Sequence, residues 1–169
     1  MLPSAFAVSF ADTRGHWAED EINRWSDRGV IQGHDGDFEP NSPITRADMA
    51  VIIDRVMDYQ TKAENNFADL GTAYYTDPIL RVAQAGVMQG DGKNVRPKAN
   101  ITRAEVVKLL DNMISDYITE SGTATPKGTG IVIVKASGVT LNKAKLSSTV
   151  VLGGKAGEVK ATDCEITGK

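Results

Sequence analysis

The sequence predicts an α+β chain that is mainly helical, with two tandem helix–loop–helix repeats followed by a short C-terminal β segment of β-solenoid-like character. The repeats are indicated by identical residues at an offset of 57 positions, the distance from Arg46 to Arg103. The β segment is indicated by a second period of 20 positions, the distance from Val139 to Val159. A stretch rich in Gly, Thr, Ser and Pro, residues 119–130, separates the two regions. The expected parts are residues 1–9 (extension), 10–60 (repeat one), 61–118 (repeat two), 119–130 (linker) and 131–169 (β-rich segment).

Composition sets the broad class. The chain has 169 residues, of which 41% are hydrophobic and 24% charged, as in an ordinary folded protein. Its net charge of -3 argues against a general nucleic-acid binder, because such proteins carry an excess of positive charge. No apolar run approaches the roughly 20 residues of a membrane-spanning helix, so we expect no membrane insertion. Cys164 is the only cysteine and excludes an internal disulfide.

The N-terminal extension carries a weak sign of export. The triplet from Ala5 to Ala7 has the small-x-small form of a signal-peptidase site, as if the tail of an export signal remained. We therefore expect a secreted protein.

The internal repeat extends without a gap over both copies. It is carried by these pairs: Phe10/Phe67, Asp12/Asp69, Asp20/Asp77, Ile22/Ile79, Arg24/Arg81, Gly29/Gly86, Gly33/Gly90, Pro40/Pro97 and Arg46/Arg103. Two copies of one supersecondary unit are therefore expected.

Each copy begins with a short amphipathic helix. Its apolar face is formed by Ala18, Ile22 and Trp25 in copy one, and by Tyr75, Ile79 and Val82 in copy two. Gly29 and Gly86 follow at the position where a helix commonly ends in a left-handed residue. A loop rich in Gly, Asp, Asn and Pro then leads to a second, longer helix, expected to run to about Asp58 and Asp116.

The second helix of each copy opens with a nearly identical motif, "ITRAD" at residues 44–48 and "ITRAE" at residues 101–105. Thr45 and Thr102 are expected N-caps, and the acid three residues later completes a capping box. The motif arginines, Arg46 and Arg103, have no such explanation. A cation at the first helical position opposes the helix dipole, so we expect the fold to leave these guanidinium groups for a ligand.

Residues 10–53 and 67–110 resemble S-layer homology repeats nearly end to end, and the resemblance covers about Phe10 to Ile118. It implies a non-catalytic anchor at the surface of a Gram-positive-type cell, bound to secondary cell-wall polysaccharide, often through a pyruvylated amino sugar. It also implies a groove between neighbouring repeats in which the motif arginine is prominent. The residues agree with this implication, because a guanidinium can grip a pyruvate carboxylate with two hydrogen bonds beside helix N–H groups. The alternative is that Arg46 and Arg103 pair with nearby acids such as Asp12 and Asp69 and orient the loop.

Trp17 and Tyr74 occupy matching positions and are further candidates for the site. Either ring could stack on a sugar face at the edge of the groove, or belong to the edge of the core. Copy two departs from the family pattern around Tyr74 and before Pro97, so its groove is expected to be altered. The candidate ligand-binding residues are therefore Arg46, Arg103, Trp17, Tyr74, Asp12 and Asp69.

The resemblance also implies a partner for the repeats. Such repeats usually work in threes, so we expect a third repeat elsewhere in a longer parent protein or from another chain. Two other functions stay open: self-assembly of a surface lattice, and anchoring of a carbohydrate-active enzyme whose catalytic part lies outside this chain. No catalytic motif occurs, and His16 and His34 lack partners at metal-ligand spacing, so we expect no enzyme activity, no cofactor and no metal.

The second period predicts stacked rungs in the β-rich segment. The pairs at the offset of 20 are Val139/Val159, Leu141/Ala161, Ala144/Cys164 and Leu146/Ile166. This spacing predicts about two turns of a β-solenoid, with Cys164 as a small buried hydrophobic residue.

Overall fold

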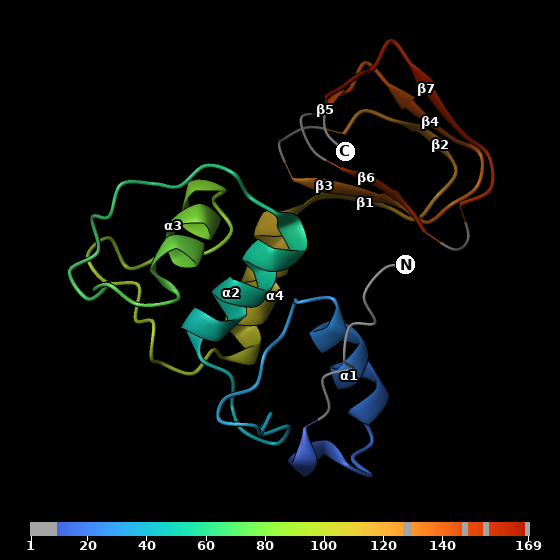
Figure 1. Cartoon of the computed structure of the whole chain (residues 1–169). Coiled ribbons are helices and arrows are strands. Elements are labelled where there is room, and N and C mark those ends of the chain that lie inside the picture. The colour runs from blue at the N-terminus through green and yellow to red at the C-terminus, as the bar shows by residue number, and fades with distance from the viewer. Residues whose placement is uncertain (1–9, 127–129, 147–148, 154–155, 168–169) are drawn as a thin grey trace, which may run out of the picture. The chain divides into compact units, whose positions relative to one another are not determined.

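The protein is described by a computed structural model that covers residues 10–126, 130–146, 149–153 and 156–167 (Figure 1). The chain forms two compact units, Met1–Thr102 and Arg103–Lys169. The extension with the triplet Ala5 to Ala7 lies outside the described residues. Helices and parallel strands together confirm the α+β class.

The first unit contains the first helix of each repeat. A 3₁₀ turn, η1 (Ala11–Thr13), precedes α1 (Glu19–Asp27), and α3 (Thr76–Gln84) is the equivalent helix of repeat two. Gly29 and Gly86 follow these helices with φ of 72° and 74°, the left-handed conformation that glycine adopts without steric cost. Their N–H groups bond back to the helix ends, to the carbonyls of Ser26 and Ala83. The predicted helix stops are therefore confirmed.

The apolar faces of α1 and α3 differ in how completely they are covered. Ile22, Ile79 and Val82 are buried as predicted, whereas Trp25 is a partly exposed member of the α1 face. The helix α2 (Arg46–Met57) packs against α3 and joins the two repeats within this unit.

The second helices begin where the sequence predicts, but only the first one ends there. Helix α2 stops at Met57, and Asp58 caps it in the left-handed conformation with φ of 54°. Helix α4 (Arg103–Met113) ends at Met113. The predicted end at about Asp116 is therefore wrong. The following segment forms strand β1 (Ile114–Ile118) instead, because it pairs with a strand later in the chain. This long-range pairing overrides the helical spacing of the local sequence.

In the part of the second unit that the structure describes, the chain continues from α4 into parallel strands arranged in three sheets. One sheet has the order β1–β3–β6, the second β2–β4–β7, and the third pairs β5 with β8. The remaining strands are β2 (Gly122–Ala124), β3 (Ile131–Val134), β4 (Val139–Asn142), β5 (Lys145–Leu146), β6 (Val150–Leu152), β7 (Val159–Thr162) and β8 (Glu165–Ile166). Strand β2 lies inside the predicted linker, so pairing begins well before Ile131.

The strand register follows the period of 20 residues. Val139 pairs with Val159 and Leu141 with Ala161 across β4 and β7, and Leu146 pairs with Ile166 across β5 and β8. The core of the second unit is formed by Val132, Val134, Val139, Leu141 and Ala144, and Val150 and Val159 pack against it. Cys164 packs against this core but is only partly buried, with its thiol near the carbonyl of Leu141.

Candidate functional site

The loops before the second helices are held by the predicted acids. Asp12 accepts hydrogen bonds from the backbone N–H groups of Phe38 (3.0 Å) and Glu39 (2.7 Å). Those N–H groups, Phe38 first, hold the pKa of Asp12 below its ordinary value. Asp69 repeats this arrangement with the N–H groups of Val95 and Arg96, at 2.9 and 2.7 Å. Both carboxylates therefore act on the loop backbone of their own repeat.

Arg46 uses its guanidinium inside the fold. The residue is only 4% exposed, and its Nε and Nη2 donate to the carbonyls of Val95 (2.9 Å) and Gln89 (3.1 Å). The expectation that the Arg46 guanidinium has no role in the fold is therefore wrong. Contact with a distant loop offsets the dipole penalty at the helix start, because a charged donor satisfies the buried carbonyl of Val95 and the partly buried carbonyl of Gln89. Asp69 and Arg46 thus hold the N–H and the C=O of the same residue, Val95.

The first N–H groups of α2, which have no acceptor within the helix, donate to the same loop. The N–H of Arg46 donates to the carbonyl of Ala99, and the N–H of Ala47 donates to the carbonyl of Pro97, both at 2.9 Å. The loop of repeat two therefore covers the helix terminus that the sequence suggested for an anion.

The predicted cap is present, but its acid has different partners. Thr45 Oγ1 accepts the N–H of Asp48 at 3.1 Å, and the Thr45 hydroxyl donates to Asp48 Oδ2 at 2.5 Å. The other carboxylate oxygen, Oδ1, accepts the hydroxyl of Tyr74 at 2.5 Å. This bond joins repeat two to the first turn of α2 and raises the pKa of Tyr74 to about 12, since the phenol donates to a carboxylate.

The candidate aromatic rings lie on the surface. Trp17 is 87% exposed and Tyr74 is 70% exposed, so neither belongs to the edge of the core. The Tyr74 ring is steadied at one edge by Tyr75, with centroids 5.0 Å apart, and at its hydroxyl by Asp48. Trp17 lies beside the ring of His16, with centroids 5.3 Å apart.

The structure brings only some of the candidate residues together. Arg46, Asp69 and Tyr74 all act around the first turn of α2, whereas Asp12 acts on the loop of repeat one. Arg103 begins α4 in the other unit, where its side chain is exposed.

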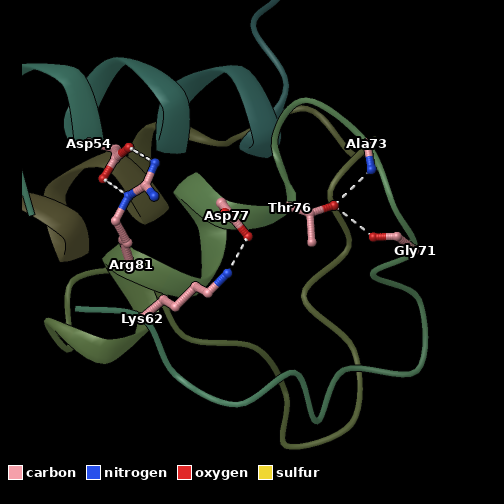
Figure 2. A network of polar contacts seen from close by, with 7 residues as sticks. All are labelled: Asp54, Lys62, Gly71, Ala73, Thr76, Asp77 and Arg81. Carbon is pink, nitrogen blue, oxygen red and sulfur yellow. Dashed lines mark hydrogen bonds and ion pairs between the residues drawn. The ribbon is translucent and has the colours of Figure 1, made fainter. Parts of the chain in front are cut away.

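Sequence reasoning missed a second polar cluster, which also joins the repeats. The Arg81 guanidinium on α3 donates through Nε and Nη2 to the two carboxylate oxygens of Asp54 on α2, each at 2.8 Å (Figure 2). The same view shows Lys62 paired with Asp77, and the Thr76 hydroxyl at the start of α3. The match of Arg24 with Arg81 was the available signal, but it does not reveal a partner on another helix.

A polar pocket of about 450 Å³ lies beside this pair. It is lined by Gly29, Asp54, Arg55, Asp58, Tyr59, Gln60 and Arg81. The Arg55 guanidinium is engaged by the Val30 carbonyl and by Gln32, and Arg81 is engaged by Asp54. The pocket therefore offers mainly neutralised charges, which suit hydroxyl groups better than a strongly charged ligand.

Comparison with known proteins follows the two repeats. The family described as "S-layer homology domain" matches residues 9–50 and 66–107. The S-layer protein of Bacillus licheniformis and S-layer protein EA1 of Bacillus anthracis are each 38% identical over 112 residues, covering 63% of this chain and 13% of theirs. Exoglucanase XynX of Acetivibrio thermocellus is 32% identical over 125 residues, covering 70% of this chain and 12% of its own. The chain thus spans about an eighth of the length of these relatives. In the described residues, no helix is long and apolar enough to cross a membrane.

Proposed function

The chain belongs to the S-layer homology domain family through residues 9–50 and 66–107, and we therefore propose that it is a non-catalytic anchoring module of the cell wall. Its partner is secondary cell-wall polysaccharide, and its location is the outer face of a Gram-positive-type cell. The observation that supports this most directly is the presence of the family's repeat in S-layer proteins and in a glucanase alike. A module shared by proteins with such different names is better explained by a common location than by a common reaction.

The ligand surface that we propose lies at the first turn of α2, around the Tyr74 ring. This ring is exposed, yet its hydroxyl and one edge are fixed, so stacking on a sugar costs little conformational entropy. The loop that covers the helix start carries exposed Arg96 and Lys98, which supply positive charge for the carboxylate of a pyruvylated amino sugar.

Arg46 and Asp69 act in this proposal by holding the loop in place. Arg46 binds two of its carbonyls, and Asp69 binds the N–H groups of Val95 and Arg96. Asp12 does the same for the loop of repeat one, the repeat that carries the exposed ring of Trp17. Arg103 is exposed, and direct contact with an anion stays a prediction for it.

Co-sedimentation with wall sacculi tests the polysaccharide. Native sacculi should retain the protein, and sacculi stripped of secondary polysaccharide by acid should not. Equal retention by both would contradict the proposal and favour peptidoglycan as the ligand. Tyr74→Ala should weaken retention roughly three- to tenfold, because an aromatic contact contributes about 0.5–1.5 kcal/mol. Tyr117→Ala, at another partly exposed tyrosine in β1, is the matched control.

The S-layer relatives also favour a second candidate, assembly of a surface lattice. Soluble wall polysaccharide separates the two functions. It should release an anchor from sacculi, whereas protein–protein assembly should be unaffected by it.

We also propose that the second unit is part of a β-solenoid. Its support is the parallel pairing at intervals of 20 residues along β4 and β7 and along β5 and β8. Insertion of one residue between β4 and β7 should shift this register and unfold the unit, whereas insertion of a whole 20-residue rung should be tolerated.

A further inference from the structure

The contact between the two repeats is built from one face of α2 and one face of α3. On α2 this face carries Ala50, Ile53 and Asp54, all of which are buried. On α3, Arg81 binds Asp54, and the next residue in the helix, Val82, is fully buried. The two packed helices therefore combine buried apolar side chains with a bidentate ion pair.

Helix α4 of repeat two carries residues that correspond to the α2 side of this interface. At the offset of 57, Ala50, Ile53 and Asp54 of α2 correspond on α4 to the residues Val107, Leu110 and Asp111. All three are exposed, Val107 by 65% where Ala50 is at 0%. Asp111 pairs with Lys108 at 2.9 Å, within its own helix and in solvent.

Repeat one carries the α3 side. Here Arg24 and Trp25 on α1 correspond to Arg81 and Val82 on α3. Trp25 is 40% exposed where Val82 is at 0%, and Arg24 pairs with Glu21 on the surface of α1. Each copy of the chain thus exposes two helix faces, one on α4 and one on α1, whose counterparts on α2 and α3 are already packed against each other.

We propose that α4 of one copy docks against α1 of a second copy, with Asp111 of the first bound to Arg24 of the second. The apolar contact is made by Val107 and Leu110 of one copy and Trp25 of the other. The surface ion pairs that now hold Arg24 and Asp111 are exposed i, i+3 pairs, which contribute little and are readily exchanged. Because the two faces differ, the contact is heterologous and can be extended from copy to copy.

This docking rests on the internal repeat and not on the proposed polysaccharide ligand. In the docked pair, Arg103 would lie against a loop of the neighbouring repeat, as Arg46 does within one chain. Arg103 could therefore contact an anion directly only in a copy that is not docked. A second copy is the partner that fits best, because Asp111 on α4 and Arg24 on α1 carry opposite charges and both helices expose apolar side chains.

Sedimentation velocity of the purified chain over a range of concentrations, without polysaccharide, tests the proposal. The parent chain should show concentration-dependent association. R24E and D111R should each weaken it by about tenfold or more, since each places like charges across the interface. K160E, which makes a charge reversal of the same sign as R24E on strand β7, should associate like the parent.

An equal mixture of R24E and D111R should associate again. The glutamate introduced on α1 of one variant then meets the arginine introduced on α4 of the other, and the native pair of Arg24 with Asp111 forms at the next contact.

Thermal melts by circular dichroism should show that both variants are folded, as expected for exposed positions. A parent chain that stays monomeric at every concentration would overturn the proposal and leave α4 to a repeat of another protein or of a longer chain. Association that survives both charge reversals, or a mixture that fails to restore it, would also overturn the pairing of Arg24 with Asp111.

Discussion

Arg81 and Asp54 are joined by two hydrogen bonds of 2.8 Å, and this pair ties α3 of repeat two to α2 of repeat one. Asp54 is buried, and only about a quarter of the Arg81 side chain reaches solvent. Removal of either partner leaves the other charge in a poorly solvated place. The pair therefore fixes how the two repeats of the first unit pack together.

The first prediction concerns this pair. Arg81→Ala should lower the free energy of unfolding by about 2–3 kcal/mol, because a buried carboxylate loses two charge-assisted hydrogen bonds. Urea denaturation measures the change. Lys62→Ala is the control, since its pair with Asp77 is exposed and should contribute less than about 0.5 kcal/mol. Equal effects of the two changes would show that the junction does not depend on Arg81.

The helix cap gives a second prediction. Thr45→Ala should cost about 0.5–2 kcal/mol, because the N–H of Asp48 loses its acceptor at the start of α2. Thr45→Ser should retain most of the stability, since it keeps the hydroxyl. Urea denaturation of both variants, compared with the parent, decides the matter; a serine variant as unstable as the alanine variant would point to the lost methyl group instead.

The cap was predictable from the sequence because it depends on residues three positions apart. The same holds for the left-handed glycines after α1 and α3 and for the period of 20 in the strands, all of which follow from regular spacing. The partners of Arg46 were not predictable, since Gln89 and Val95 lie 43 and 49 positions away. The prediction of where α4 ends was wrong for a similar reason. Residues 114–118 form a strand only because they pair with β3, which comes later in the chain.

Two glycines at matching positions give a third prediction. A Cβ built on Gly90 would clash with the backbone oxygen of Asn94 and would lie 2.8 Å from the ring of Phe67. Gly90→Ala should therefore destabilise the first unit by roughly 2–4 kcal/mol, because the obstacle is backbone and cannot rotate away. Gly71→Ala, at a position with no neighbour within 4 Å, should change stability by less than about 0.5 kcal/mol.

Gly33 has the same surroundings in repeat one. Its added Cβ would clash with the backbone oxygen of Asp37 and with the ring of Phe10. Thermal melts of the Gly33 and Gly90 alanine variants should show losses of similar size. A neutral Gly90→Ala would mean that the loop can move to admit a methyl group.

Tyr74 gives a prediction for pH. Its hydrogen bond to Asp48 raises its pKa from the ordinary value of about 10 to about 12. The stability that this bond contributes should be constant below about pH 10 and should be lost as the pH rises through about 12, when the phenol ionises beside the carboxylate. The ultraviolet absorbance of tyrosinate, followed against pH, measures the titration.

Two variants assign that titration to Tyr74. Tyr74→Phe should remove the latest step, and Asp48→Asn should bring the step back toward about pH 10. Burial also raises the pKa of Tyr59, so the difference between parent and variant is the quantity to compare. A late step that persists in Tyr74→Phe would assign it to another tyrosine.

The final prediction separates the two arginines of the repeated motif. Arg46→Ala should cost roughly 2–4 kcal/mol, because the buried carbonyl of Val95 and the partly buried carbonyl of Gln89 lose a charged donor. Arg46→Lys should recover only part of this, since an ammonium group cannot reproduce the guanidinium fork. Arg103→Ala, at an exposed position, should change stability by less than about 0.5 kcal/mol.

Calorimetry with purified wall polysaccharide, below the melting temperature of each variant, then tests binding. If Arg46 acts by holding the loop, Arg46→Ala should lose affinity in step with its loss of folding, and Arg46→Lys should bind in proportion to the structure that it regains. A folded Arg46→Lys that binds about tenfold or more weakly than the parent would instead assign the guanidinium a direct contact with the sugar.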